Sequence, residues 1–204
     1  NIISYEFNKD ENKLLLATEL QQIYRHSSLG TYYVYDIKSK QLTLVSPNKI
    51  QEPTFNNDGS MIAFGFDNNL YVKNLNSGKE LQITTDGKKN SIINGITDWV
   101  YEEEFAFVRA FDWNKEGTKI AYIRFDETEV PEFSMDVYGK ELYQTQQVFK
   151  YPKAGEANAK VSLHVYDLAS EKSSNINLSE YNSYYIPRIK WTEDNSILSV
   201  QLTN

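Results

Sequence analysis

The sequence predicts an all-β protein, a β-propeller of roughly four blades, each a four-stranded antiparallel sheet. Three observations lead to this prediction: an internal repeat, alternation of apolar and polar residues, and a high aromatic content. Aromatic residues make up 14% of the 204 residues, with 15 Tyr, 10 Phe and 3 Trp. Such residues are favoured in half-buried strands, and repeated groups of short strands are typical of propellers. We interpret residues 1–204 as a single partial propeller domain.

Four segments share one pattern, which marks the start of each predicted blade: an aromatic residue, a polar turn, then an apolar strand. The segments are EFNKDENKLLLA (6–17), TFNNDGSMIAF (54–64), DWNKEGTKIAY (112–122) and KWTEDNSILSV (190–200). Gly59 and Gly117 lie in two of the turns, where glycine adopts a positive φ without steric cost. The repeated aromatic residues are expected in the core, where neighbouring blades pack; they are Phe7, Phe55, Trp113 and Trp191.

A second pattern of strand, turn and strand follows the first three segments. It comprises YYVYDIKSKQLTLV (32–45), LYVKNLNSGKELQIT (70–84) and LHVYDLASEKSSNI (163–176). Leu70 and Val72 alternate with Tyr71 and Lys73, which is the period-two pattern of a strand with two different faces. The spacing of the repeats is uneven, which indicates two insertions, at about 94–106 and about 129–150. Insertions between blades form loops, and loops often carry function.

Composition and charge argue against several classes of function. The net charge is −7 and no stripe of Lys or Arg offsets it, so we expect no nucleic-acid partner. The chain has no cysteine and only two histidines, His26 and His164, so neither a metal site nor a cofactor is expected. Apolar runs are too short to span a bilayer, so we expect no membrane anchor in this chain. It begins in mid-pattern with NIISYEF, as a piece of a longer protein would.

The first insertion contains TDWVYEEEF (97–105), in which Thr97 or Asp98 is expected to cap a short helix. On a helix, Glu103 and Glu104 would diverge by only about 100°, so both could border one pocket. Two carboxylates can each accept a hydrogen bond from one primary ammonium group. Two alternatives remain open: a solvated acidic turn, and a catalytic carboxylate pair of the glycoside hydrolase kind.

Arg25, in YRHSS (24–28), also lies at a predicted loop. Its planar guanidinium could hold a carbonyl or carboxylate group, although a surface arginine or a structural ion pair would show the same pattern. The chain has no Gly-x-Ser-x-Gly nucleophile motif and no glycine-rich nucleotide motif. We therefore expect no catalytic residue in this chain.

These stretches resemble a known family. NGITDWVYEEEF (94–105) is similar to the glutamate motif of the dipeptidyl peptidase IV family, within the prolyl oligopeptidase-type serine peptidases. Further stretches resemble the same family in the same order: YRHSSLGTYYVYDI, DNNLYVKNL, FDETEVPEFSMDVY and YPKAGEANAKVSLHVYDL. The resemblance covers essentially the whole chain. It implies an eight-bladed propeller, of which this chain is about the first half, joined to a C-terminal α/β-hydrolase domain that carries a Ser-Asp-His triad.

The resemblance also implies roles for particular residues. Glu103 and Glu104 match the two acids that bind the free amino terminus of a peptide substrate. Because EEEF is one residue shorter than the commonest form of the motif, Glu102 with Glu103 is an alternative pair. Arg25 resembles a residue that holds a substrate carbonyl. The insertion at about 129–150 resembles an extended arm that takes part in homodimer contacts, although a loop packed inward is also compatible with its aromatic residues.

The sequence therefore predicts the substrate-recognition propeller of a serine exopeptidase that releases N-terminal Xaa-Pro or Xaa-Ala dipeptides. Its expected partners are a peptide amino terminus, the C-terminal hydrolase domain and a second copy of the protein. The resemblance implies a periplasmic, cell-surface or secreted enzyme. The alternative is a non-catalytic propeller that binds peptide or glycan as an interaction module. Because a partial ring leaves sheet edges and blade faces uncovered, we also expect this chain to self-associate.

Overall fold

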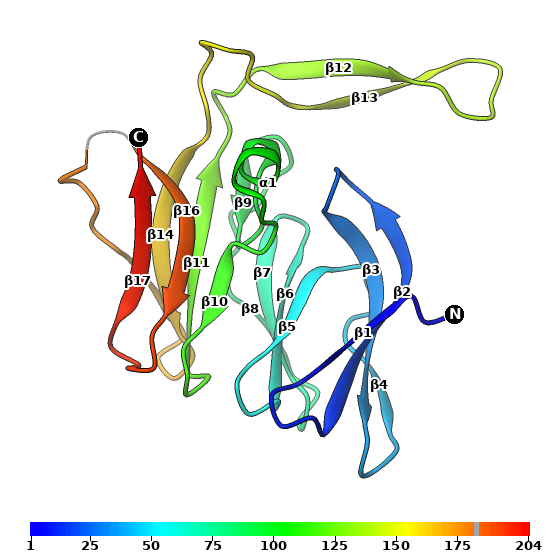
Figure 1. Ribbon diagram of the computed structural model, residues 1–204, viewed down its shortest axis with the longest axis vertical. Coiled ribbons are helices and arrows are strands. Elements are labelled where there is room, and N and C mark those ends of the chain that lie inside the picture. The colour runs from blue at the N-terminus through cyan, green and yellow to red at the C-terminus, as the bar shows by residue number, and fades with distance from the viewer. Residues whose placement is uncertain (182–183) are drawn as a thin grey trace.

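The computed structural model describes residues 1–181 and 184–204, and within these ranges it contains seventeen strands and one helix. The strands form antiparallel sheets that stand side by side in chain order, as the blades of a propeller do (Figure 1). The prediction of an all-β propeller is confirmed. No helix in the described ranges combines the length and the apolar character needed to cross a membrane.

The first two sheets have four strands each, paired in chain order. The first contains β1 (Ser4–Phe7), β2 (Lys13–Gln22), β3 (Ser28–Asp36) and β4 (Leu42–Leu44). The second contains β5 (Gln51–Phe55), β6 (Met61–Phe66), β7 (Asn69–Asn74) and β8 (Glu80–Gln82). Gly59 lies in the turn between β5 and β6 with a φ of 67°, so the predicted role of this glycine is confirmed.

The third and fourth sheets begin at the third and fourth repeats. The third contains β10 (Phe111–Trp113), β11 (Lys119–Asp126), β14 (Lys160–Asp167) and β15 (Lys172–Asn175), with β9 (Ile92–Asn94) also paired to β11. Within the described residues, the fourth sheet contains β16 (Tyr185–Trp191) and β17 (Leu198–Thr203). Gly117, between β10 and β11, has the same φ of 67° as Gly59.

Side chains of the repeat segments join neighbouring sheets. The indole nitrogen of Trp113 donates to the carbonyl oxygen of Thr54 in the second sheet, at 3.2 Å. The Asp112 carboxylate accepts from the backbone nitrogen of Trp191 at 2.9 Å and from Nζ of Lys190 at 2.8 Å. Trp113 and Trp191 are buried. Their predicted place in the core between blades is confirmed. Phe55 packs against the core cluster that contains Ile62 and Phe64.

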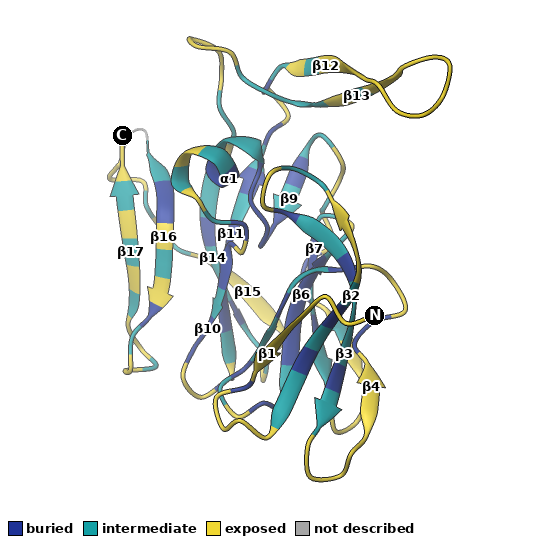
Figure 2. Cartoon of the chain, turned by 45° about the vertical axis from the view of Figure 1, so that its right-hand side comes forward, coloured by how far each residue is buried: buried dark blue, intermediate teal, exposed yellow. Residues whose placement is uncertain are grey.

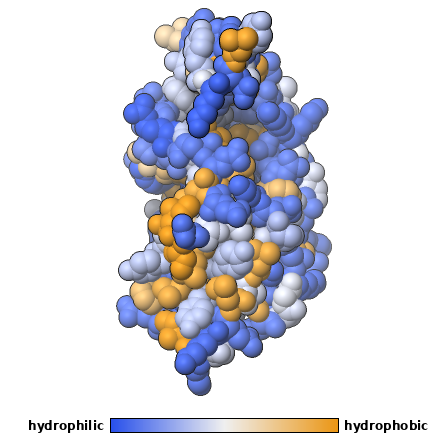
Figure 3. All heavy atoms as spheres, turned by 90° about the vertical axis from the view of Figure 1, so that its right-hand side faces the viewer, coloured by the Kyte–Doolittle hydropathy of each residue, from blue (hydrophilic) through white to orange (hydrophobic). Residues whose placement is uncertain are grey.

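The prediction of a buried aromatic residue was wrong for Phe7, whose exposed fraction is 46%. Phe7 belongs to β1, the edge strand of the first sheet, and all four residues of β1 are exposed (Figure 2). Hydrophobic residues gather on the side of the molecule that carries this sheet (Figure 3). Exposed apolar residues of the first sheet and its amino-terminal extension include Ile2, Ile3, Phe7, Leu20, Leu42 and Leu44. The expected self-association of the chain stays a prediction.

The helix α1 (Trp99–Phe105) lies in the chain between β9 and β10, both strands of the third sheet. The Asp98 side chain caps it by accepting a hydrogen bond from the backbone nitrogen of Tyr101 at 3.0 Å. Tyr101 is buried, and its hydroxyl oxygen accepts from the backbone nitrogen of Ile186 on β16 at 3.0 Å. The helix ends at Ala106, which has a φ of 56°. This buried tyrosine thus connects α1 to the fourth sheet.

A hairpin of β12 (Glu132–Val137) and β13 (Thr145–Lys150) projects from the sheets beyond α1 (Figure 1). Most of its residues are exposed (Figure 2). We call this segment the arm hairpin. Its base lies close to α1, so the hairpin forms one wall of the site described next.

Candidate functional site

The three glutamates of α1 have three different surroundings. Glu102 is 1% exposed, and its Oε1 accepts hydrogen bonds from the backbone nitrogens of His26 at 2.6 Å and Ser27 at 3.0 Å. Glu103 is only partly exposed, whereas Glu104 is exposed. Residues 23–27 form the loop between β2 and β3. The glutamate helix and this loop of the first sheet are therefore in direct contact.

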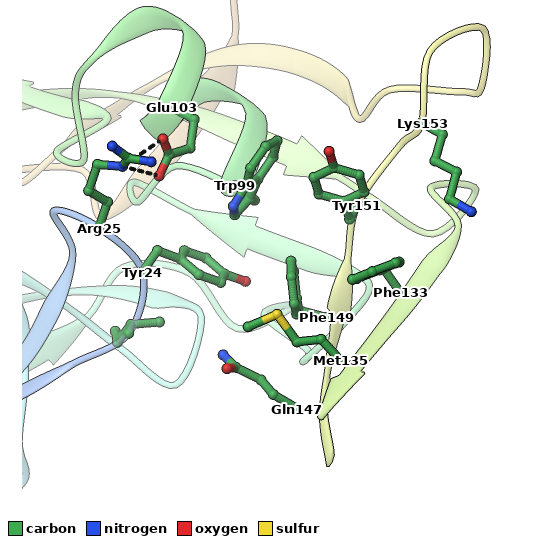
Figure 4. Close-up of a pocket in the computed structure, with 11 residues that line it drawn as sticks. Tyr24, Arg25, Trp99, Glu103, Phe133, Met135, Gln147, Phe149, Tyr151 and Lys153 are labelled. Atoms are coloured by element: carbon green, nitrogen blue, oxygen red, sulfur yellow. Dashed lines mark hydrogen bonds and ion pairs between the residues drawn. The ribbon is translucent and has the colours of Figure 1, made fainter. Parts of the chain in front are cut away.

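Arg25 and Glu103 form an ion pair across this contact. Nε of Arg25 lies 3.1 Å from Oε2 and 3.3 Å from Oε1 of Glu103, as the dashed lines in Figure 4 mark. The Arg25 side chain is 72% exposed, and that of Glu103 is 18% exposed. Two of the three predicted site residues are thus brought together. Glu104 follows directly on the same helix, about 100° further around its axis.

A pocket of about 590 Å³ lies between α1, the 23–27 loop and the arm hairpin (Figure 4). The residues that line it are mostly aromatic or apolar: Ile23, Tyr24, Arg25, Trp99, Glu103, Phe133, Met135, Gln147, Phe149, Tyr151 and Lys153. The sequence analysis did not predict this pocket. The aromatic residues in and beside the second insertion were its only signal, and they could equally have belonged to an interface.

Aromatic contacts connect the arm hairpin to both elements of the site. The Tyr24 ring packs on Phe149 with the centroids 5.8 Å apart, and the Trp99 ring packs edge-on against Tyr151 at 4.5 Å. Tyr24 precedes Arg25, and Trp99 begins the glutamate helix. By contrast, Tyr138 and Tyr143 are 80% and 77% exposed near the hairpin tip. The base of the hairpin therefore packs inward, and its tip faces solvent.

Two buried acids lie near the site, Asp98 and Glu127. Burial raises the pKa of Asp98 from 3.8 to about 6. Burial, and then the nearby Asp98 carboxylate, raise the pKa of Glu127 from 4.5 to about 7. Burial also raises the pKa of Tyr24, with Glu127 as the next cause. The sequence analysis missed Glu127, although it stands within the DETEVP stretch.

The described residues include no group of three His, Cys, Asp or Glu side chains that could hold a metal ion. His26 has an exposed side chain and contributes its backbone nitrogen to Glu102. His164 lies on β14, where its Nε2 is 2.9 Å from Oγ of Ser162 and its ring stacks on Tyr122. The groups that line the site are the Glu103 carboxylate, the Arg25 guanidinium, the Lys153 ammonium, the Gln147 amide and apolar or aromatic side chains.

Comparisons with known proteins identify a family and a similar fold. A family model described as the dipeptidyl peptidase IV (DPP IV) N-terminal region matches residues 8–204. The crystal structure of dipeptidyl peptidase 4 from Porphyromonas gingivalis superposes with a TM-score of 0.95 and 40% identity, covering 100% of this chain and 29% of that one. The propeller region of that structure and the fold described above are therefore closely similar.

Curated relatives carry related names. A "Probable dipeptidyl-aminopeptidase B" from Chaetomium globosum is 34% identical over 195 residues, covering 88% of this chain and 21% of the relative. A protein of the same name from Trichophyton verrucosum is 38% identical over 187 residues, covering 84% of this chain and 21% of the relative. The chain spans about a fifth of the length of these relatives.

Proposed function

Since this chain belongs to the family of dipeptidyl peptidase IV N-terminal regions, we propose that it binds the free amino terminus of peptide substrates for a serine-type dipeptidyl peptidase. The chain is part of the N-terminal propeller of such a peptidase, and its relatives are dipeptidyl aminopeptidases. The proposal concerns what the propeller contributes to the whole enzyme: an anchor for one charged end of the substrate.

The contact between Arg25 and Glu103 carries this proposal. Arg25, Glu103 and Glu104 together have a net charge of −1, which a single ammonium group would neutralise. The ammonium has three donors, and Glu103 and Glu104 can each accept one of them as a charge-assisted hydrogen bond. Glu102 is a poorer candidate because it is buried and bonded to two backbone nitrogens. The geometry therefore favours Glu103 with Glu104 over the alternative pair.

Arg25 has donors left for the substrate backbone. Its contact with Glu103 uses Nε, and the guanidinium has four further N–H donors in the same plane. Its side chain is 72% exposed, so a carbonyl oxygen of the bound peptide could approach it. We assign Arg25 this role, with Glu103 holding the guanidinium in place.

An anchor for the amino terminus explains why such an enzyme releases dipeptides. If the ammonium is fixed at Glu103 and Glu104, the second peptide bond lies at a fixed distance along the extended substrate. A Ser-Asp-His triad on an α/β-hydrolase domain outside this chain would cleave that bond, and the same domain would select Pro or Ala at the second position. The proposed setting is periplasmic, cell-surface or secreted. The proposed homodimer would use the arm hairpin, whose exposed Leu142 and Tyr143 lie near its tip.

The test compares two substrates of the full-length protein. One is an Xaa-Pro dipeptide on a chromogenic leaving group with a free amino terminus, and the other is its N-acetylated form. Because acetylation removes the charge and two of the three donors, we expect kcat/KM to fall by at least about 100-fold, the equivalent of two charge-assisted hydrogen bonds. Equal hydrolysis of both substrates would contradict the proposal. Binding without hydrolysis would favour an interaction module instead.

A further inference from the structure

We propose that Glu102 is a positioning residue: its buried carboxylate holds the 23–27 loop so that Arg25 meets Glu103. The inference rests on the proposed function, since it concerns how the peptide-binding groups are kept in place. It assigns Glu102 no contact with the substrate. The test therefore separates a failure of this inference from a failure of the proposed function.

The surroundings of Glu102 are unusual for a carboxylate. It is 1% exposed, and Oε1 accepts two hydrogen bonds from consecutive backbone nitrogens, those of His26 and Ser27. Its Oε2 has no hydrogen-bond partner within the described residues. Burying a carboxylate without full hydrogen bonding is unfavourable. The two charge-assisted bonds to the loop are therefore the interactions that offset this cost at the site.

The backbone on both sides of Arg25 is fixed by side chains. Nε2 of Gln22 donates to the carbonyl oxygen of Tyr24 at 2.6 Å and to that of Arg25 at 2.9 Å. The next two backbone nitrogens along the chain are those that Glu102 binds. Oγ of Ser27 also accepts from the backbone nitrogen of Tyr24 at 3.2 Å. Gln22 and Ser27 belong to the loop region itself, and among the described residues Glu102 is the side chain of α1 that hydrogen-bonds this backbone.

The ion pair between Arg25 and Glu103 would, by itself, hold the 23–27 loop only weakly. The Arg25 side chain is 72% exposed, and ion pairs in water contribute little to stability because of solvent screening and side-chain entropy. It joins elements 78 positions apart in the sequence. A buried carboxylate bonded to two backbone nitrogens restricts the loop more strongly than a solvated guanidinium does. The buried contact of Glu102 therefore determines where Arg25 can point.

The first part of the test uses kinetics of the full-length protein. Glu102→Gln should change KM by less than about threefold, because an amide oxygen can still accept both N–H groups. Glu102→Ala should raise KM at least about tenfold, with a smaller change in kcat, because it removes binding made through a displaced Arg25. Glu102→Asp, which shortens the side chain, should also raise KM. It replaces the Ala variant in this test if the Ala variant does not fold. Glu116→Ala, at an exposed turn, is the control.

A double-mutant cycle with Arg25→Ala identifies the route of the effect. If Glu102 acts through Arg25, Glu102→Ala should raise KM by less than about twofold in the Arg25→Ala background. Independent, multiplying effects of the two substitutions would overturn the inference. So would a Gln variant as impaired as the Ala variant, since the amide oxygen can still accept both N–H groups of the loop.

Hydrogen exchange provides a readout that does not depend on activity. In Glu102→Ala or Glu102→Asp, the backbone amides of His26 and Ser27 should exchange at least about tenfold faster than in wild type. Amides of β6, in the core of the second sheet, should be unchanged. If the full-length protein has no dipeptidyl peptidase activity, the proposed function fails, yet this measurement still tests the contact. Unchanged exchange at residues 26 and 27 would overturn the inference whatever the activity.

Discussion

Nε of Arg25 lies 3.1 Å from Oε2 of Glu103, although the two residues are 78 positions apart in the sequence. Arg25 belongs to a loop of the first sheet, and Glu103 belongs to the helix between β9 and β10 of the third sheet. The contact therefore brings together two candidate groups that lie far apart in the sequence, one on a loop of the first sheet and one on α1. It is the feature on which the proposed peptide-binding site depends.

Removing this ion pair should affect binding far more than stability. In Arg25→Met, the free energy of unfolding should fall by less than about 1 kcal/mol, because the Arg25 side chain is largely exposed. KM for a substrate with a free amino-terminal dipeptide should rise clearly. Thermal unfolding measures the change in stability, and steady-state kinetics measures the change in KM. Lys115→Met is the matched control, since Lys115 forms an exposed pair with Glu193 at 2.7 Å remote from the site; its KM should equal that of wild type. A large loss of stability in Arg25→Met would contradict the assignment.

The buried acids predict a pH dependence of stability. Because the folded-state pKa of Asp98 is raised to about 6 from 3.8, the folded state binds this proton more tightly than the unfolded state does. The stabilisation is therefore complete below the unfolded pKa and is lost as pH rises through the folded value. The raised pKa of Asp98 corresponds to a loss of roughly 3 kcal/mol in the free energy of unfolding once the group is ionised. Glu127, whose pKa is about 7, should act in the same direction.

Asp98→Asn tests this prediction, because asparagine also caps helices but carries no charge. The stability of the variant relative to wild type should rise between about pH 4 and about pH 6, the unfolded and folded pKa values of Asp98, and stay level above that range. Glu127→Gln should do the same at slightly higher pH. Thermal unfolding across this range measures the difference. A constant gap between variant and wild type at every pH would contradict burial of an ionisable Asp98.

The two buried tryptophans offer a matched comparison of contacts between blades. Trp113 and Trp191 are both 8% exposed. The indole nitrogen of Trp113 donates to Thr54, whereas that of Trp191 has no hydrogen-bond partner within the described residues. Trp113→Phe should therefore destabilise the chain by about 1 kcal/mol more than Trp191→Phe does, the typical contribution of one hydrogen bond. Chemical denaturation of both variants measures this; an equal effect, or a larger one in Trp191→Phe, would count against the interblade bond.

Peptide binding by the 204-residue chain alone should be very weak. A carboxylate and an ammonium 4 Å apart attract by about 4 kcal/mol at an effective dielectric constant of 20 but only about 1 kcal/mol in bulk water. Glu104 and Arg25 are exposed in this chain. Calorimetric titration with a dipeptide amide should show a dissociation constant above about 1 mM. Micromolar binding would show that the propeller needs no covering domain.

The sheets could be predicted from the sequence because their signals are local. Each repeat begins a new sheet, and Gly59 and Gly117 adopt the backbone conformation that their turns require. Phe7 shows the limit of this reasoning: like Trp113 it lies on the first strand of its sheet, yet all of β1 is exposed, so burial depends on what packs outside the repeat.

The site was predictable only in part. The residue types of Arg25, Glu103 and Glu104 indicated charge recognition, but no local pattern places Arg25 beside Glu103. The burial of Glu102 was also beyond local reasoning, because it depends on backbone nitrogens of the loop between β2 and β3, far away in the sequence. The aromatic pocket requires the arm hairpin to fold back toward α1, which long-range packing alone determines.

The most direct test of the central claim uses Glu103→Gln and Glu104→Gln in the full-length protein, with free and N-acetylated Xaa-Pro substrates. If these two carboxylates bind the ammonium, each variant should lose at least about tenfold in kcat/KM on the free substrate, equivalent to one charge-assisted hydrogen bond. Hydrolysis of the acetylated substrate should change little, so the preference for a free amino terminus should collapse. A preference that survives in both variants would contradict the claim.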